Sequence, residues 1–288
     1  MRARGSSRFG ACDDRLREPQ APGLRPVIRF LDRWRRILGT GASFALFGAS
    51  PLVLGLLVHP VLALTLPRER RELRMQKLVH RSFQGFCSFM RWVGVVEVHV
   101  EGWEQLPCDG GVLLVANHPT LLDYVLLVAL LPQADCVVKR AHWSNPFTAG
   151  VVRGAGYIPN DGGEATVEAC AARLRAGRTL LLFPEGTRSP LGGLGPFERG
   201  AAHVALAAGV AAIPVAIRCE PRGLMRGQPW YDVPESRMRF TLALGPPIAA
   251  DGLPGGRARA ARALTARYRA YFEARSRRGH GAVGCDEQ

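Results

Sequence analysis

The longest apolar stretch of the chain runs from Ile37 to Leu66 and contains no Asp, Glu, Lys or Arg. It exceeds the roughly 20 residues that a helix needs to cross a lipid bilayer, so we expect it to contact a membrane. Pro51 and Pro60 interrupt the stretch, and arginines flank it on both sides. Because basic residues prefer the cytoplasmic side, equal flanks favour a re-entrant helical hairpin with both ends on that side. A single tilted span is the alternative.

The next stretch, residues 74–93, places apolar side chains at helical spacing opposite basic ones. Such a helix could lie on an anionic membrane surface, or it could pack against a domain, and the pattern fits both interpretations. The apolar set is Leu78, Phe83, Phe86, Phe89, Met90 and Val93, and the basic set is Arg74, Lys77, Arg81 and Arg91.

From residue 95 onward, short apolar stretches alternate with stretches of helical composition. Val96, Val98 and Val100 alternate with polar residues, as in a half-buried strand. The other predicted strands are Val112–Ala116, Cys136–Lys139, Tyr157–Pro159, Thr179–Phe183, Ala211–Ile217 and Arg239–Leu244, and the predicted helices are Pro119–Leu131, His142–Val152, Glu164–Ala176, Phe197–Ala208 and Arg257–Arg278. This alternation predicts an α/β sandwich with a largely parallel central sheet.

The same pattern divides the chain into four parts. Residues 1–25 are rich in Arg, Gly, Pro and Ser without apolar periodicity, which predicts a disordered basic tail. A membrane-associated helical region over 26–94 follows. The α/β domain then covers 95–278, and 279–288 form a tail.

The composition narrows the classes of molecule that this chain is expected to bind. The net charge is +14, and the basic residues are almost all arginine, which favours an acidic partner such as anionic lipid. No aromatic-interleaved basic motif or zinc-finger spacing supports nucleic acid, so none is expected. The seven cysteines are scattered without a Cys-x-x-Cys pair, so we expect neither a disulfide framework nor a metal site.

Candidate chemistry begins where the strand Val112–Ala116 ends, at Asn117-His118-Pro119, with Asp123 five positions after the histidine. Polar residues at the carboxyl end of a buried strand are where α/β folds place their active sites. On one regular helix the His118 and Asp123 side chains would point about 140° apart. They can meet only if His118 lies in the strand-to-helix turn and Asp123 in the first helical turns, and Pro119 suits a first helical position. The carboxylate would then orient the imidazole as a base.

A second polar turn, Phe183-Pro184-Glu185-Gly186-Thr187-Arg188-Ser189, follows another predicted buried strand. Strand ends of one sheet lie side by side, so this loop could face His118. Gly186 lets backbone N–H groups approach a ligand, and Arg188 offers a bidentate fork for an anion.

Together the two segments closely resemble the glycerolipid acyltransferase family, which acylates 1-acylglycerol-3-phosphate and related lysolipids. The family's His-x4-Asp and Phe-Pro-Glu-Gly-Thr-Arg-Ser blocks are complete here, and its proline-centred strand matches Ile213-Pro214-Val215. The resemblance covers about Val96 to Ile248. The chain also looks like a bacterial subgroup whose members occur beside aryl-polyene pigment genes.

One block departs from the family pattern. The family has Gly-x-Ile-x-x-x-Arg, whose Arg helps to hold the acceptor's phosphate. Here Gly156-Tyr157-Ile158-Pro159-Asn160-Asp161-Gly162 has glycine at that last position. This departure concerns the identity of the acyl acceptor, and it does not change the residues that are expected to transfer the acyl group.

The resemblance implies that a fatty acyl group passes from acyl-CoA or acyl carrier protein, as co-substrate, to a hydroxyl of a lysophospholipid, foremost 1-acylglycerol-3-phosphate, in phospholipid biosynthesis. No cofactor is implied. His118 would be the base and Asp123 its orienting partner, with Glu185, Gly186, Thr187 and Arg188 binding substrate. The expected location is the bacterial inner membrane, with membrane lipids as partners and the α/β domain on the cytoplasmic face. Two alternatives are the same transfer to a specialised acceptor (another lysolipid, a glycolipid or a polyene pigment lipid) and a non-catalytic acyl-lipid-binding protein.

Overall fold

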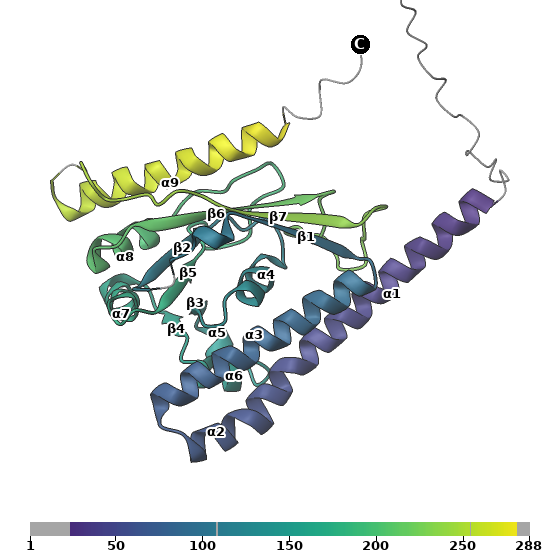
Figure 1. Ribbon diagram of the computed structural model, residues 1–288, viewed down its shortest axis with the longest axis horizontal. Helices are drawn as coiled ribbons and strands as arrows, with labels where there is room; N and C mark the ends of the chain where they lie inside the picture. The colour runs from purple at the N-terminus through teal and green to yellow at the C-terminus, as the bar shows by residue number, and fades with distance from the viewer. Residues whose placement is uncertain (1–23, 108, 254, 281–288) are drawn as a thin grey trace, which may run out of the picture.

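A computed structural model describes residues 24–107, 109–253 and 255–280, so residues 1–23 of the predicted tail over 1–25 and residues 281–288 of the predicted tail over 279–288 lie outside the described residues. Residues 24 and 25 belong to the first helix, so the tail was predicted two residues too long. Figure 1 shows a central sheet between two layers of helices. Helices α3 and α4 cover one face, with the long α1 outside α3, and α7, α8 and α9 cover the other. The fold is the α/β sandwich that the sequence predicts.

The sheet has seven strands in the order β1-β7-β6-β2-β5-β3-β4. Every neighbouring pair is parallel except β6 and β7, which are antiparallel. The strands are β1 (Val96–Glu101), β2 (Val112–Ala116), β3 (Asp135–Lys139), β4 (Ile158–Asn160), β5 (Thr179–Leu182), β6 (Ala212–Glu220) and β7 (Met238–Leu244). All five residues of β2 are buried, because helices cover both faces of this central strand.

The helices follow the predicted order with several shifted boundaries. They are α1 (Leu24–Leu52), the π-helical turn η2 (Val53–Val58), α2 (His59–Thr65), α3 (Arg68–Trp92), the 3-10 turn η3 (Trp103–Gln105), α4 (Asp123–Leu130), α5 (Ala141–Ser144), α6 (Ala149–Gly154), α7 (Gly163–Arg175), α8 (Gly200–Ala208) and α9 (Arg257–His280). The single helix predicted over His142–Val152 is wrong. Pro146 disfavours helical backbone at Asn145, so the chain breaks into α5 and α6 there.

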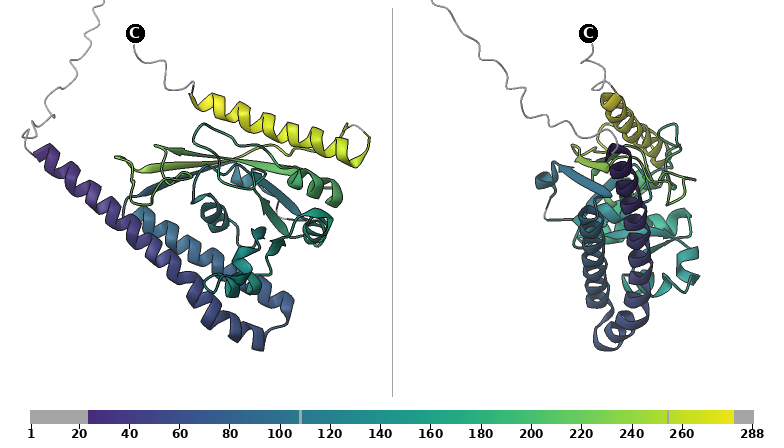
Figure 2. Two further views of the ribbon diagram at one scale, coloured as in Figure 1. Left: turned by 180° about the vertical axis from the view of Figure 1, so that it is seen from behind. Right: turned by 90° about the vertical axis from the view of Figure 1, so that its right-hand side faces the viewer.

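The apolar stretch does not fold back on itself at Pro51, so the hairpin expected within Ile37–Leu66 is wrong. α1, η2 and α2 form one continuous helical path, and the chain reverses only at Leu66–Pro67 before α3 (Figure 2). Pro51 lacks the N–H that a regular helix needs, and the π-turn directly after it absorbs the mismatch.

This path presents apolar side chains to the outside. The part from Phe30 to Thr65 is long and apolar enough to cross a membrane, and only 6% of its most apolar window is buried. η2 packs against α6 with almost no space between the backbones, since a Cβ on Gly150 would lie 2.5 Å from the Cα of Gly55. The exposed set includes Trp34, Leu38, Leu46, Leu56, Leu57 and Leu64.

For α3 the domain-packing interpretation is the correct one. Met75, Val79, Phe83, Phe86 and Met90 are buried against the domain. The basic side chains predicted on the opposite face point away from it.

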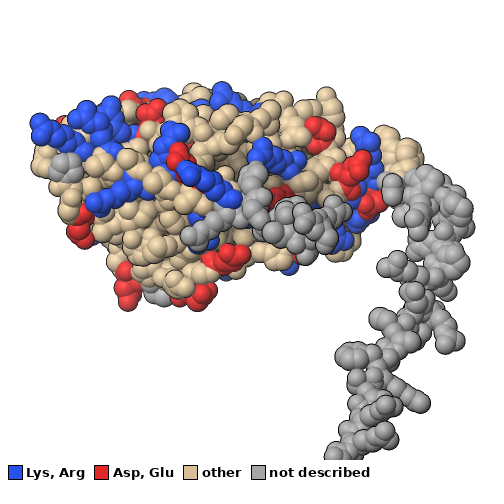
Figure 3. Space-filling view, turned by 90° about the horizontal axis from the view of Figure 1, so that it is seen from above, with Lys and Arg blue, Asp and Glu red and all other residues tan. Residues whose placement is uncertain are grey.

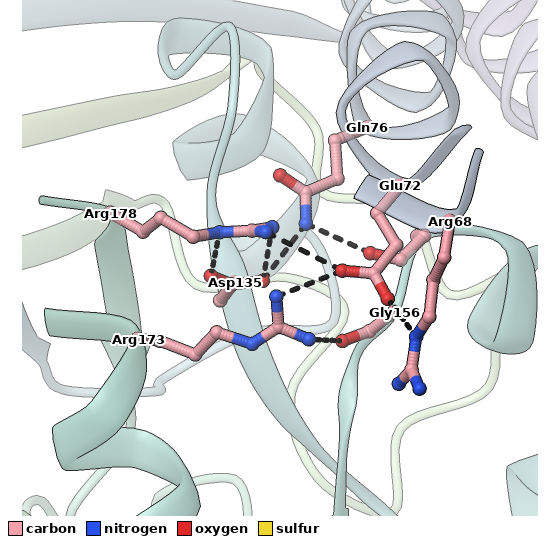
Figure 4. A network of polar contacts seen from close by, with 8 residues as sticks. Arg68, Glu72, Gln76, Asp135, Gly156, Arg173 and Arg178 are labelled. Atoms are coloured by element: carbon pink, nitrogen blue, oxygen red, sulfur yellow. Dashed lines mark hydrogen bonds and ion pairs between the residues drawn. The ribbon is translucent and has the colours of Figure 1, made fainter. Parts of the chain in front are cut away.

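A buried ionic network fastens α3 to the far end of the sheet (Figure 4). Glu72 on α3 accepts a hydrogen bond from Arg173 of α7 at 2.8 Å, and Asp135 of β3 pairs with Arg178 at 2.6 Å. Gln76 joins the two halves by donating to Asp135 at 2.9 Å. Burial raises the pKa of Asp135, with the charge of Arg178 opposing it. Burial also acts to raise the pKa of Glu72, but the hydrogen bonds from its arginine partners outweigh it and hold that pKa below its ordinary value.

Candidate active site

The segment Asn117–Asp123 leaves the carboxyl end of β2 at the centre of the sheet. The Asn117 side chain imitates a peptide group: its Oδ1 accepts from the N–H of Ile217 at 2.7 Å, and its Nδ2 donates to the carbonyl of Ile217 at 2.9 Å. These bonds extend the pairing of β2 with β6 by one step beyond Ala116. The backbone that carries His118 is therefore fixed to the sheet.

His118 and Asp123 meet as the sequence predicts, although the helix starts later than expected. α4 begins at Asp123 and not at Pro119, so residues 119–122 form a turn that brings the two side chains together. His118 Nδ1 lies 2.9 Å from Asp123 Oδ2. The backbone N–H of Thr120 donates to that same Oδ2 at 2.6 Å, and its hydroxyl donates to Oδ1 at 2.7 Å.

Asp123 is fully buried, and its carboxylate is surrounded by donors. Burial raises its pKa, while the hydrogen bonds from His118 and Thr120 act in the opposite direction. Because the Thr120 N–H can only donate, Oδ2 must accept, and this favours the ionised carboxylate. The arrangement keeps a proton on His118 Nδ1 and leaves Nε2 unprotonated in the neutral ring, as a general base requires.

The second predicted segment, Phe183–Ser189, lies next to His118. The Phe183 ring stacks on the imidazole with 4.4 Å between ring centroids and 27° between planes. The Ser189 N–H donates to the His118 carbonyl at 2.7 Å. Sequence reasoning did not assign Phe183 a role, and the signals for it are its place directly after β5 and at the start of the Phe-Pro-Glu-Gly-Thr-Arg-Ser block.

Glu185 points into the protein, away from any ligand site. Its carboxylate accepts from the His118 N–H at 3.0 Å, the Ser189 hydroxyl at 2.8 Å and the Gly195 N–H at 2.8 Å. This geometry makes Glu185 a brace between the two loops, and its role in binding substrate stays a prediction.

The other predicted residues of this loop differ in position. Gly186 has a left-handed φ of 63°, and its N–H closes a turn onto the Phe183 carbonyl at 3.0 Å. Gly186 and Thr187 are exposed. Arg188 reaches back to the Met225 carbonyl at 3.3 Å and lines a cavity together with His118.

That cavity, which we call the catalytic cavity, has a volume of about 300 Å³. Its polar wall is His118, Tyr124, His142 and Arg188. Its apolar wall comes from α1, α3, α4 and the turn before α4, through Phe44, Phe47, Phe86, Leu121, Leu122 and Val125. Such a space suits a molecule with one polar end and one apolar end. In the described part of the chain, no group of three or more His, Cys, Asp or Glu could hold a metal ion.

Gly162, at the position where the family has an arginine, precedes α7 with φ 73° and has no neighbouring atoms where a Cβ would lie. The preceding residue, Asp161, pairs at 2.9 Å with Arg140, which follows β3.

Comparison with known proteins places this site in a family. A family model described as Acyltransferase matches residues 97–218, which include both segments of the site. A chloroplast 1-acyl-sn-glycerol-3-phosphate acyltransferase of Arabidopsis thaliana is 27% identical over 69% of this chain and 55% of its own length. The part of the chain that contains both segments of the site is therefore similar to glycerolipid acyltransferases.

Two further acyltransferases are similar to this chain in sequence or in fold. A 1-acyl-sn-glycerol-3-phosphate acyltransferase of Pseudomonas aeruginosa is 27% identical over 59% of this chain and 67% of its own length. The crystal structure of the 1-acyl-sn-glycerophosphate acyltransferase PlsC from Thermotoga maritima matches with a TM-score of 0.60 and 20% identity, over 88% of this chain and 98% of that one. The chain spans about half the length of the first curated relatives it matches.

Proposed function

We propose that this protein transfers a fatty acyl group from a thioester to a hydroxyl of a lysophospholipid. One observation carries the proposal: a buried, donor-saturated Asp123 holds His118 Nδ1 at 2.9 Å, at the wall of a cavity that is apolar on one side and contains Arg188. A general base beside an amphipathic cavity is what this reaction needs.

In the proposed reaction, His118 Nε2 takes the proton of the acceptor hydroxyl as its oxygen attacks the thioester carbonyl. Asp123 stabilises the imidazolium that forms, and Phe183 limits rotation of the ring. The tetrahedral intermediate then breaks its carbon–sulfur bond, and the thiolate takes the proton back from His118. Direct transfer needs no nucleophilic side chain.

Arg188 is the proposed partner of the anionic group of the acceptor, because its guanidinium lines the same cavity as His118. The N–H of Gly186 is already used within its turn, so the backbone N–H groups that follow it are the better candidates to stabilise the oxyanion. Each such donor typically contributes about 3–4 kcal/mol to the transition state.

The foremost acceptor is 1-acylglycerol-3-phosphate, since the named relatives carry that activity. A specialised acceptor is the second candidate. It is favoured by Gly162, which replaces the arginine of the family pattern, and Arg140 pairs with the neighbouring Asp161.

The proposed location is a bacterial inner membrane, with the α1–η2–α2 path in the bilayer and the α/β domain on the cytoplasmic face. The exposed apolar side chains of that path support it. Acyl-CoA and acyl carrier protein both remain candidate donors.

The test is His118→Ala in purified membranes, with thiol release from a long-chain thioester followed in the presence of 1-acylglycerol-3-phosphate. Loss of the base should reduce the rate by roughly 10²–10⁴-fold. His99→Ala, on the polar side of β1 and half exposed, is the matched control and should keep full activity. Near-full activity in a folded His118→Ala protein would refute the mechanism.

A further inference from the structure

A second cavity, which we call the polar cavity, lies on the other side of the loops that form the site. Its volume is about 380 Å³, larger than the catalytic cavity. Its floor is the face of β6 and β7 that carries Arg218 and Thr241, and the end of α9 closes one side through Phe272 and Arg275.

The two cavities share a wall. Asn117 and Pro119, on either side of His118, line the polar cavity, and so does Ser189, next to Arg188. His118 and Arg188 themselves line the catalytic cavity. Along each of the two loops, adjacent residues thus line different cavities. The Ser189 N–H donates to the His118 carbonyl at 2.7 Å and joins the two loops there. A molecule that crosses the rim of this wall could have one part in each cavity.

Three guanidinium groups line the polar cavity: Arg218, Arg222 and Arg275. The ion pairs found in the described residues include none of the three. Arg218 and Arg222 donate to backbone carbonyls, and the Arg275 guanidinium lies 5.9 Å from the centroid of the Tyr271 ring. Arg222, for example, donates to the Leu191 carbonyl at 2.6 Å. Two carboxylates, Glu101 and Glu220, also line the cavity, so it presents both cations and hydrogen-bond acceptors.

The polar cavity also faces a different environment from the catalytic cavity. The catalytic cavity contains Phe44 and Phe47 of α1, whose outer side is apolar. The polar cavity lies on the α9 face of the sheet, opposite α1, α2 and α3 (Figures 1 and 2). Basic side chains are spread over that face among acidic ones (Figure 3), and α9 alone contains eight arginines and one glutamate. A water-soluble anion therefore has direct access to the polar cavity.

We propose that the polar cavity binds the phosphopantetheine arm of the thioester donor. This inference rests on the proposed function, because it names where the donor's carrier lies during that reaction. The arm carries a phosphate, which the guanidinium groups would bind. It also carries two amide groups, whose N–H atoms would find acceptors in Glu101 and Glu220. The thioester lies at the rim of the shared wall, with the acyl chain in the catalytic cavity.

The chemistry balances with this placement. The acceptor oxygen forms a bond to the thioester carbon, the carbon–sulfur bond breaks, and the thiol leaves on the arm into the polar cavity. The proton passes from the acceptor hydroxyl through His118 to sulfur. The lipid product remains on the side of the apolar helices, and the water-soluble product remains on the opposite side.

The experiment uses the full-length protein in membranes with three palmitoyl donors: palmitoyl-CoA, palmitoyl-acyl carrier protein, and palmitoyl-N-acetylcysteamine, which lacks phosphate. Arg218→Gln, Arg222→Gln and Arg275→Gln should each raise the KM for palmitoyl-CoA by roughly tenfold or more, because each removes one charged contact. The KM for the N-acetylcysteamine thioester and for the acceptor should not change. Arg259→Gln, exposed on α9 and outside the cavity, is the matched control.

Comparison of palmitoyl-CoA with palmitoyl-acyl carrier protein distinguishes the two carriers that bear a phosphopantetheine arm. An increase in KM with palmitoyl-CoA alone identifies coenzyme A, and an increase with the carrier protein alone identifies the protein-borne arm; either supports the polar cavity. Equal increases with all three donors, or no increase with either phosphate-bearing donor, would overturn it.

If the proposed function is wrong, the unaltered protein releases no thiol from any of the three donors. Calorimetric binding of coenzyme A itself then still tests the cavity. Weaker binding by the three variants than by Arg259→Gln supports the inference, and equal binding contradicts it.

Discussion

Replacing Asp123 with asparagine tests how the site holds its base. Asp123 Oδ2 accepts from both His118 Nδ1 and the backbone N–H of Thr120, at 2.9 and 2.6 Å. A backbone N–H cannot accept a hydrogen bond, so in Asp123→Asn the amide oxygen must take the Oδ2 position. The amide NH₂ then faces the Thr120 hydroxyl, which can rotate to accept. His118 keeps its proton on Nδ1 and still offers Nε2 as the base.

The expected loss is therefore the charge on the carboxylate and not the tautomer. A hydrogen bond to a charged group contributes about 1.5–3 kcal/mol, which corresponds to roughly 10- to 150-fold in rate. In a Ser-His-Asp triad, where the same change inverts the tautomer, the loss is about 10⁴-fold. The two mechanisms thus differ by a measurable factor.

The assay is initial thiol release at saturating acceptor, with Asp123→Asn compared with the unaltered protein and with His118→Ala. Thermal unfolding of each protein checks that the fold is intact. A folded Asp123→Asn protein as inactive as His118→Ala would show that the amide NH₂ faces the histidine, contrary to the geometry. A loss below about threefold would show that the buried charge does not contribute.

Three further predictions concern stability. The Glu185 carboxylate is buried and accepts three hydrogen bonds, and Glu185→Gln replaces one of its acceptor oxygens with a donor. This variant should have a free energy of unfolding lower by about 2–3 kcal/mol, measured as a lower midpoint of thermal unfolding. An unchanged midpoint would contradict the role of Glu185 as a brace. Glu72→Gln removes the carboxylate partner of the largely buried Arg173 and should lower the free energy of unfolding by about 3 kcal/mol. The control Glu168→Gln, in an exposed pair, should have a much smaller effect. Because the folded-state pKa of Glu72 is lowered, its contribution is present above its unfolded pKa and is lost as pH falls through the folded value. The difference in stability between Glu72→Gln and the unaltered protein should therefore shrink as the solution is acidified through the folded-state pKa, and a difference that stays constant with pH would refute this. Gly150→Ala must push η2 and α6 apart and should lower the midpoint of thermal unfolding. The control Gly48→Ala, which has open space around it, should be neutral or should stabilise the protein by up to about 1 kcal/mol. Equal effects of the two variants would contradict the close contact between η2 and α6.

The features of this protein that could be predicted from sequence are those set by short-range patterns. Alternation of apolar strands and helical stretches predicted the α/β sandwich, because burial on both faces of a central strand such as β2 requires a continuous apolar run. His118 and Asp123 were predicted to meet because only a turn between them satisfies their spacing, and the structure contains that turn.

The remaining features depend on contacts between distant segments. Glu185 resembles a ligand residue in sequence, but its three donors come from loops up to 67 positions away and turn it inward. The network of Glu72 and Asp135 joins a helix to a strand that no local pattern connects. Pro51 was expected to reverse the chain, because a sequence does not show that a π-turn can absorb the missing hydrogen bond.

The amide of Asn117 has a consequence for how this enzyme could acquire new substrates. By completing the ladder between β2 and β6, it ties the backbone that carries the proposed base to the sheet, while Glu185 and Ser189 hold His118 from the neighbouring loop. His142, which also lines the catalytic cavity, lies on the very short helix α5. We expect that this helix and the segments beside it can change in length and sequence without moving His118. The reaction and the choice of acceptor are thus mechanically separate, and a chain with glycine at position 162 can keep the whole catalytic pair in place.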